Sequence, residues 1–363
     1  MDYKETLMWK EINETPKIFS EIQGKNKTTM TELLKAVKDG NATNFVGAAR
    51  GTSNHALVYF KYLLEINSNY TVGLSAPSVI TMYKGKVNYK NSVIIACSQS
   101  GMSEDVLEVI KIGNSQGAIT IGVTNDESSP IAKECKFHLY CSAGEEKSVT
   151  ATKTYCAQLY LMLWLASELA GLQNNLITLK HLDKDIAHVV PEIDALTTKY
   201  AQEFKDMKNG FVLSRGLCYS IALEATLKLQ ETCYIKMEGF SGSEFYHGPM
   251  AMVNEETPVF IYCAKNDCDE EMQAIVRADQ IKLIKKMLSL GAPVLLITND
   301  MLLTGRFSNC NEALFNLGMP EEFTMFPFAL FAQMLACKIS CLIGNNPDTP
   351  RALKKVAKSV DKQ

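Results

Sequence analysis

The two halves of the chain repeat a strand-and-turn pattern, and this repeat constrains the fold more than any other feature. Residues 45–51 form a short strand-like run that ends in Arg-Gly before a helical pattern, and residues 211–216 do the same. Downstream, residues 117–126 resemble residues 291–300. A further apolar run lies between these anchors in each half. Each half therefore predicts a strand–helix–strand–helix–strand order, which is typical of a parallel sheet covered by helices.

The length supports the same division. A chain of 363 residues suggests two domains of ordinary size, and a hydrophobic content of 47% can supply both cores. We expect an α/β fold with two tandem three-layer αβα domains. The predicted organisation is an N-terminal helical segment at 1–38, a first domain at 39–172, a helical linker at 173–200, a second domain at 201–343 and a C-terminal tail at 344–363 that closes the site.

Composition excludes several classes of protein. The 37 basic and 40 acidic residues give a net charge of −3 without a basic run, which disfavours a nucleic-acid binder. The charged residues 1–5 do not resemble a secretory leader, and the most apolar stretch, 155–171, contains polar residues and predicts a buried helix instead of a membrane span. Eleven cysteines without a Cys-x-x-Cys pair indicate reduced thiols. We expect a cytoplasmic protein that uses no metal and no cofactor and binds neither membrane nor nucleic acid.

A hydroxyl-rich tetrad at 98–101, Ser-Gln-Ser-Gly, follows an apolar run and precedes a helix that opens at Ser103. Hydroxyls and backbone N–H groups at the positive end of a helix form an anion site. The tetrad has no Lys or Arg, so it is not a nucleotide-binding Walker loop, and it suits one phosphomonoester. A Ser-rich turn that merely caps a helix is the commoner explanation. In the second half Ala-Lys-Asn at 264–266 replaces the tetrad, so we expect one phosphate cradle, in the first half.

One helical segment carries charged residues on a single face. Glu224, Lys228 and Glu231 are spaced at i, i+4 and i+7. An exposed salt-bridged stripe is the usual explanation of such spacing. Here apolar residues occupy the other faces of the helix, so little of it should face water. A buried carboxylate beside a lysine is then a candidate general base.

Two irregular segments hold further candidates. His247 lies in a Gly- and Pro-rich loop, where a histidine can titrate near neutrality but is more often simply exposed. Pro347 and Pro350 predict an extended strap that ends in a short basic helix. Lys354 and Lys355 lie just beyond, and such a pair is usually solvated.

Six motifs occur in an order that resembles a known family. They are residues 51–53, 98–103, 143–153, 221–231, 242–249 and 350–355. Almost end to end, the chain is similar to the double sugar-isomerase (SIS) domain of the glucosamine-6-phosphate synthase isomerase region. It resembles the SIS-type glucosamine-6-phosphate deaminases more closely still, in its Ala-Gly-Glu-Glu-Lys run and its Asn-Pro-Asp tail. The resemblance implies flavodoxin-like domains.

The resemblance also implies a phosphosugar site. The residues that would hold the 6-phosphate are Ser53, Ser98, Gln99, Ser100 and Ser103. Thr52 and the region of Val149 would contact the sugar. Ala151 stands where the synthase has a serine, which puts synthase-like sugar contacts in doubt there.

Catalytic roles follow from the same resemblance. Glu231 would move the proton between carbons 1 and 2, and His247 would open the ring, reaching across from the partner chain of a homodimer. Lys355 matches the lysine that forms a Schiff base with the ketose in the synthase, whereas Lys354 should point elsewhere. Glu224 and Lys228 would be supporting groups.

The expected reaction is a deamination. The first cysteine is Cys97, and we expect no amidotransferase domain before the first sheet and no glutaminase activity. Glucosamine 6-phosphate and water would give fructose 6-phosphate and ammonia. Two alternatives stay open: a deglycase that acts on a fructosamine 6-phosphate (an Amadori compound), and a non-catalytic sugar-phosphate regulator.

Overall fold

The computed structural model describes residues 1–315 and 317–355, which form two compact units. Unit 1 comprises Met1–Ile12 and His188–Arg351, and unit 2 comprises Asn13–Ala187 with the tail from Ala352. The division falls within the predicted N-terminal helical segment and within the predicted linker. The end of the tail, from Ala352, therefore belongs to the unit that holds the hydroxyl-rich tetrad, whereas residues 344–351 belong to unit 1.

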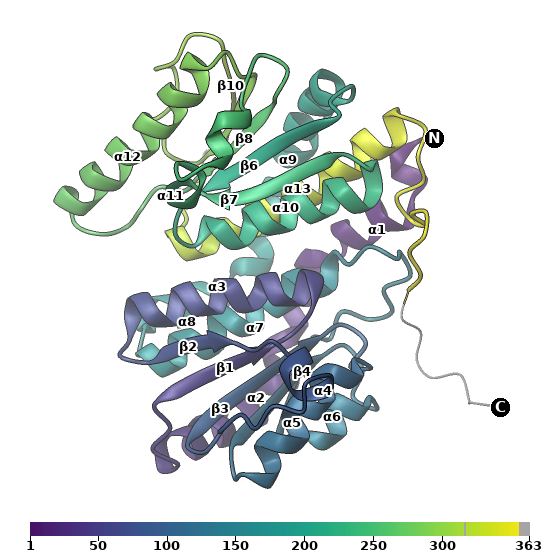
Figure 1. Cartoon of the computed structure of the whole chain (residues 1–363), viewed down its shortest axis with the longest axis vertical. Coiled ribbons are helices and arrows are strands. Elements are labelled where there is room, and N and C mark those ends of the chain that lie inside the picture. The colour runs from purple at the N-terminus through teal and green to yellow at the C-terminus, as the bar shows by residue number, and fades with distance from the viewer. Residues whose placement is uncertain (316, 356–363) are drawn as a thin grey trace. The chain divides into compact units, whose positions relative to one another are not determined.

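Unit 2 is built on a five-stranded parallel sheet in the order β2-β1-β3-β4-β5 (Figure 1). The strands are β1 (Asn44–Ala48), β2 (Thr71–Leu74), β3 (Ser92–Ser98), β4 (Ile119–Thr124) and β5 (Phe137–Tyr140). The helices are α2 (Thr15–Asp39), α3 (Gly51–Asn67), α4 (Ser78–Thr81), α5 (Glu104–Ser115), α6 (Pro130–Glu134), α7 (Lys153–Ala170) and α8 (Gln173–Thr178). α7 packs on α2 and α3, whereas α5 packs on α4 and α6. Helices thus cover both faces, and β3 and β4 are buried almost throughout.

Unit 1 repeats this architecture in the order β10-β9-β8-β6-β7, again all parallel. The strands are β6 (Asn209–Ser214), β7 (Lys236–Ser241), β8 (Val259–Cys263), β9 (Val294–Thr298) and β10 (Cys310–Leu314). The main helices are α10 (Cys218–Cys233), α12 (Glu270–Ser289), α13 (Glu321–Leu342) and the part of α9 (Leu182–Phe204) from His188 onward, with short α11 (Gly242–Phe245) and η2 (Pro249–Met252). The segments η1 (Tyr3–Glu5) and α1 (Leu7–Asn13) precede α2 in the chain. The α/β three-layer fold with two parallel sheets is confirmed.

The sequence pattern found three strands in each half and missed two. The missed strands, β2, β5, β7 and β10, are the edges of the two sheets. An edge strand has only one hydrogen-bonded neighbour and is partly exposed, so it needs no continuous apolar run. β2, for example, buries only Val72. The central strands were visible because both of their faces are buried.

Two apolar helices form much of the interior. α7 is buried along most of its length, as predicted for 155–171. That stretch is not the most apolar one in the chain, however, because the residues of α13 are more hydrophobic on average. α13 is long and apolar enough to cross a membrane by length and composition, but 94% of its most apolar window is buried inside the structure. The apolar character of α13 is therefore explained by its place in the protein core.

The start of the tail is anchored to unit 1. Asp348 accepts hydrogen bonds from the backbone N–H groups of Leu7 at 2.8 Å and Met8 at 2.7 Å. The Arg351 guanidinium lies 4.2 Å from the ring centroid of Tyr234, a cation–π distance. The described tail, 344–355, contains no helix, in agreement with the predicted strap. The predicted short basic helix is not seen before Lys355, and any continuation lies outside the described residues.

Candidate functional site

A cavity of about 310 Å³ lies in unit 2, at the carboxyl ends of the adjacent strands β1 and β3. Ligands of parallel sheets bind at this edge. Its lining residues are Arg50, Thr52, Ser53, Cys97, Ser98, Gln99, Ser100, Ser103, Val106, Val149, Ala151, Lys354 and Lys355. The structure thus gathers every residue predicted to bind the phosphate, both predicted sugar contacts and the tail lysine.

The hydroxyl-rich tetrad folds as a tight turn before α5. The Gly101 N–H donates to Ser98 Oγ at 3.1 Å, and the Met102 N–H donates to Ser100 Oγ at 3.3 Å. A hydroxyl that accepts one hydrogen bond still has its own hydrogen to donate. Gly101 has φ +67°, and a Cβ there would lie 2.1 Å from Ser129 Oγ, so this position requires glycine. The turn therefore orients two hydroxyls beside the N-terminus of α5.

Ser53 accepts a hydrogen bond from a residue that the sequence pattern did not indicate. Gln158 on α7 donates from Nε2 to Ser53 Oγ at 3.0 Å, and both side chains are buried. Ser53 also hydrogen-bonds the thiol of Cys97, whose pKa is raised well above its usual range because it is buried. The sequence does contain one indication of this contact: Gln158 lies inside an otherwise apolar helix, and a buried glutamine needs a polar partner.

The cavity wall is more positive than the neutral tetrad predicted. Arg50, Lys354 and Lys355 all line it, so the prediction that Lys354 points elsewhere is wrong. The Arg50 side chain pairs with Asp105 at 2.8 Å from Nε, and the Ser103 hydroxyl donates to the other oxygen of that carboxylate at 2.6 Å. Burial acts to raise the pKa of Asp105, but these two partners outweigh it and hold the pKa below its usual value. In this structure Ser103 therefore donates to Asp105.

Lys355 is held by a buried carboxylate. Its Nζ lies 3.2 Å from Glu146 Oε2 and 2.7 Å from the Ser148 carbonyl oxygen. The other oxygen of Glu146 accepts from the backbone N–H groups of Thr152 at 2.9 Å and Thr154 at 3.1 Å, where α7 begins. Glu146 was visible in the sequence only as part of a motif, because its partner is 209 residues away.

In unit 1 the charged face of α10 is buried. Lys228 Nζ lies 3.2 Å from Glu224 Oε1 and 2.8 Å from Glu231 Oε2. The side chains of Glu224 and Lys228 are fully buried, whereas that of Glu231 is 22% exposed. Burial lowers the pKa of Lys228, but the charges of Glu224 and Glu231 outweigh burial and raise it above the usual range. These three residues therefore do not form an exposed salt-bridged stripe. Of the two carboxylates, Glu231 is the one with access to solvent.

His247 follows α11 in unit 1 and is exposed. Its backbone N–H donates to the Glu244 carbonyl oxygen at 3.0 Å, and the residue borders a hollow of about 580 Å³ with Tyr246 and Lys286. No residue of α10 lines this hollow, and within the described chain no hydrogen bond joins His247 to Glu231. The structure thus leaves His247 open to solvent.

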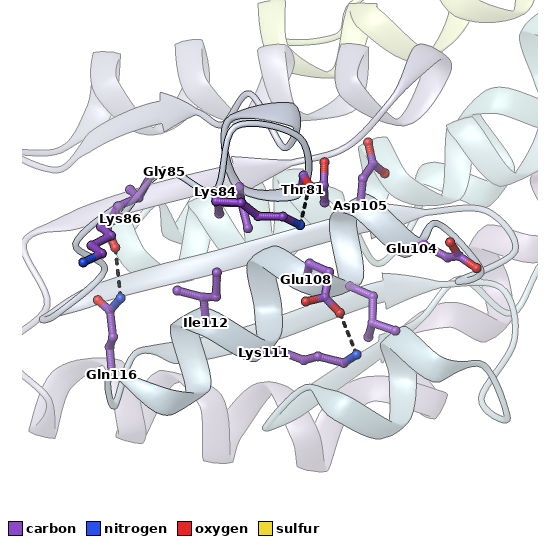
Figure 2. A pocket seen from close by; sticks show the side chains of 13 residues that line it. Thr81, Lys84, Gly85, Lys86, Glu104, Asp105, Glu108, Lys111, Ile112 and Gln116 are labelled. Atoms are coloured by element: carbon purple, nitrogen blue, oxygen red, sulfur yellow. Dashed lines mark hydrogen bonds and ion pairs between the residues drawn. The ribbon is translucent and has the colours of Figure 1, made fainter.

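A larger cavity of unit 2, about 950 Å³, lies elsewhere, between α5 and the turn after α4 (Figure 2). Figure 2 shows that its polar groups bond to one another: Lys84 donates to the Thr81 carbonyl oxygen at 2.7 Å, and Lys111 pairs with Glu108 at 2.7 Å. None of the residues predicted for the site lines this groove. The hydroxyl-lined cavity is therefore the candidate site.

Comparison with known proteins agrees with this architecture. Over 351 residues the chain is 28% identical to a glutamine–fructose-6-phosphate aminotransferase (isomerizing) of Sulfurisphaera tokodaii, covering 96% of this chain and 56% of the relative. The C-terminal domain of glucosamine-fructose-6-phosphate aminotransferase from Francisella tularensis superposes with a TM-score of 0.80 at 23% identity, covering 95% of this chain and 98% of that domain. A glucosamine-6-phosphate deaminase from Thermotoga maritima gives 0.68 at 22%, covering 94% and 98%. The two solved structures show the shared fold.

The chain therefore spans less than two thirds of the aminotransferase that it matches. The SIS domain family matches residues 41–167, within unit 2, and 203–302, within unit 1. These two segments make up more than half of the chain and contain the central strands of both sheets. The chain belongs to the SIS domain family, with two tandem SIS domains.

Proposed function

We propose that this chain is a phosphosugar isomerase-type enzyme that converts glucosamine 6-phosphate and water to fructose 6-phosphate and ammonia. The observation that carries the proposal is the cavity at the ends of β1 and β3, where hydroxyls from the start of α3 and from the turn before α5 meet three cationic residues. A cavity of about 310 Å³ suits a small ligand. The names of the relatives, an isomerizing aminotransferase and a glucosamine-6-phosphate deaminase, concern the same class of sugar.

The tetrad would hold the phosphate. Ser98 and Ser100 each accept one backbone hydrogen bond and can donate their hydroxyl hydrogen to a phosphate oxygen. The N-terminus of α5 adds its positive end. Lys354 supplies a charge that the tetrad lacks.

Glu231 would carry the proton. In the open-chain aminosugar the C2–H bond breaks, its electron pair forms the C1=C2 bond, and the aldehyde π pair moves to oxygen 1. Delivery of this proton to carbon 1 and transfer of one amino proton to oxygen 1 then give the C1 alcohol and the carbon-2 imine, which water hydrolyses to the ketose and ammonia. Glu231 is suited to this task because Lys228 orients its carboxylate and its side chain is still partly exposed. His247 would open the ring.

We also propose a homodimer in which His247 of one copy serves the sugar site of the other. The exposure of His247 and the lack of a hydrogen bond to Glu231 in the described residues support this assignment. Mixing a His247→Ala variant with a Glu231→Gln variant tests it. Recovery of activity in the mixture would support a shared site, and a mixture as inactive as its components would contradict it.

The reaction itself is tested by ammonia release from glucosamine 6-phosphate. Glu231→Gln should keep sugar-phosphate binding but lose roughly 10²–10⁴ in rate if it is the general base. Glu238→Gln, which alters an exposed carboxylate on β7, is the matched control and should keep full rate. Solvent deuterium incorporation at the wild-type rate in Glu231→Gln would show that another base acts.

A second candidate function is favoured by Lys354. Arg50 is paired with Asp105 and Lys355 with Glu146, so the positive charge of Lys354 remains on the cavity wall. The carboxylate of an amino acid joined to fructose 6-phosphate could pair with this charge, as the deglycase alternative needs. Assaying fructoselysine 6-phosphate cleavage beside ammonia release separates the two reactions, and binding without turnover of either would indicate a regulator.

A further inference from the structure

Glu146 connects two segments of the cavity wall, the loop that precedes α7 and the tail. Its side chain has no solvent exposure. One oxygen accepts the N–H groups of Thr152 and Thr154, which fixes the loop that carries Val149 and Ala151 into the cavity wall. The other oxygen pairs with Lys355. A single buried carboxylate therefore sets the position of both elements.

The contacts of Lys355 determine what its nitrogen can offer a ligand. Both partners of Nζ, a carboxylate oxygen and the Ser148 carbonyl oxygen, are acceptors, so the nitrogen donates in both bonds. With the buried Glu146 carboxylate the nitrogen forms an ion pair; an ammonium has three N–H groups, and these contacts use two. The Lys355 side chain is 22% exposed and lines the cavity. As an ammonium, the nitrogen therefore keeps one N–H for a ligand.

We propose that Glu146 is a positioning residue that keeps Lys355 as an ammonium donor toward the sugar, so that Lys355 acts through charge and not as a covalent imine with the ketose. The role rests on the proposed function, in which the electron pair of the carbonyl moves onto a substrate oxygen when the C2–H bond breaks. The ammonium stabilises that developing charge by hydrogen bonding. No bond between Nζ and carbon forms or breaks.

Substitutions of Lys355 distinguish the two roles. An arginine keeps a charged donor but cannot form an imine with a ketose. Lys355→Arg should therefore retain kcat within about tenfold of the wild type, whereas Lys355→Met should lose about a hundredfold or more. Equal loss of kcat in both variants would overturn the electrostatic role.

Borohydride trapping gives a direct chemical readout. Reduction in the presence of saturating fructose 6-phosphate converts any lysine imine to a stable secondary amine, which mass spectrometry of the tail peptide detects. We expect no adduct on Lys355 in a sample in which calorimetry shows that fructose 6-phosphate is bound. A trapped adduct on Lys355 would overturn the proposal.

The link to Glu146 can be measured without any sugar, so its result is independent of the proposed reaction. Acylation by an amine-selective reagent, followed by mass spectrometry, gives the rate at each lysine. In the wild type Lys355 should react about tenfold or more slowly than Lys354, because its nitrogen donates two hydrogen bonds. Glu146→Gln should speed acylation of Lys355 by a similar factor.

Glu145→Gln is the matched control, since Glu145 is adjacent in sequence and its side chain is 78% exposed. It should leave the Lys355 rate unchanged. Glu146→Asp, which keeps the charge, should restore part of the protection and shows whether Glu146→Gln acts only by loosening the loop. Equal acylation of Lys354 and Lys355 in the wild type, or no change in Glu146→Gln, would refute the role of Glu146. Slow acylation of Lys355 without ammonia release would instead refute the proposed function alone.

Discussion

Lys228→Met should reduce the free energy of unfolding by about 3–5 kcal/mol, because it removes the one cation that two neighbouring carboxylates share. Methionine has nearly the length of lysine and fills much of the same volume, so the cavity contribution is small. What remains is Glu224, fully buried, beside Glu231. Breaking a buried pair in this way costs several kcal/mol because a desolvated charge loses its partner.

The structure also predicts how the loss depends on a second substitution. Adding Glu224→Gln should recover on the order of 2 kcal/mol of it, since a neutral amide needs no cation. The raised pKa of Lys228 means that the wild-type cluster keeps its cation at neutral pH.

Urea unfolding followed by circular dichroism measures all four members of the cycle. The control is Lys111→Met, which removes an exposed lysine paired with Glu108 at 2.7 Å and should leave the unfolding midpoint unchanged. A loss below about 1 kcal/mol in Lys228→Met, or strictly additive effects with Glu224→Gln, would refute the assignment of a tightly coupled buried cluster.

Three further predictions concern the cavity and the second unit. Ser98→Ala combined with Ser100→Ala should weaken phosphosugar binding by about 1.5–3 kcal/mol for each hydrogen bond lost, as measured by calorimetry, and an unchanged Kd would remove the tetrad from the site. Gly101→Ala should abolish phosphosugar binding and lower Tm, because its Cβ would lie 2.1 Å from Ser129 Oγ at a φ of +67°, and unaltered binding would contradict the turn geometry. Burial, followed by neighbouring carboxylates, raises the pKa of Glu321 from 4.5 to about 7. The folded state therefore holds this proton longer than the unfolded chain, so the free energy of unfolding should fall by at most about 3 kcal/mol as pH rises through this interval, and Glu321→Gln should remove that fall in urea titrations at several pH values.

Part of the site could be predicted because local chemistry and local geometry agree there. The tetrad at 98–101 lies directly after a buried strand, and the end of such a strand is where a parallel sheet binds ligands. Glu224, Lys228 and Glu231 share a helix face by spacing alone, and the apolar residues around them indicated burial. These inferences need only the period of a helix or strand.

Other features could not be predicted because their partners are distant in the chain. Gln158 and Ser53 are 105 residues apart, and nothing near either one indicates the other. Lys354 was expected to point away from the site because consecutive residues of a helix diverge, but the described tail is not helical there and both lysines reach the cavity. Edge strands such as β2 were missed because partial exposure leaves little apolar signal.

The sequence by itself determined the architecture: two repeated halves with central apolar strands require two parallel sheets, and only the first half carries a hydroxyl-rich turn for an anion. The tertiary structure decided how the site is charged and held. It brought Lys355 to Glu146 and placed Arg50 and Lys354 on the cavity wall. The physical reason is that periodicity reports which side of an element is buried, whereas the pairing of side chains depends on the path of the whole chain.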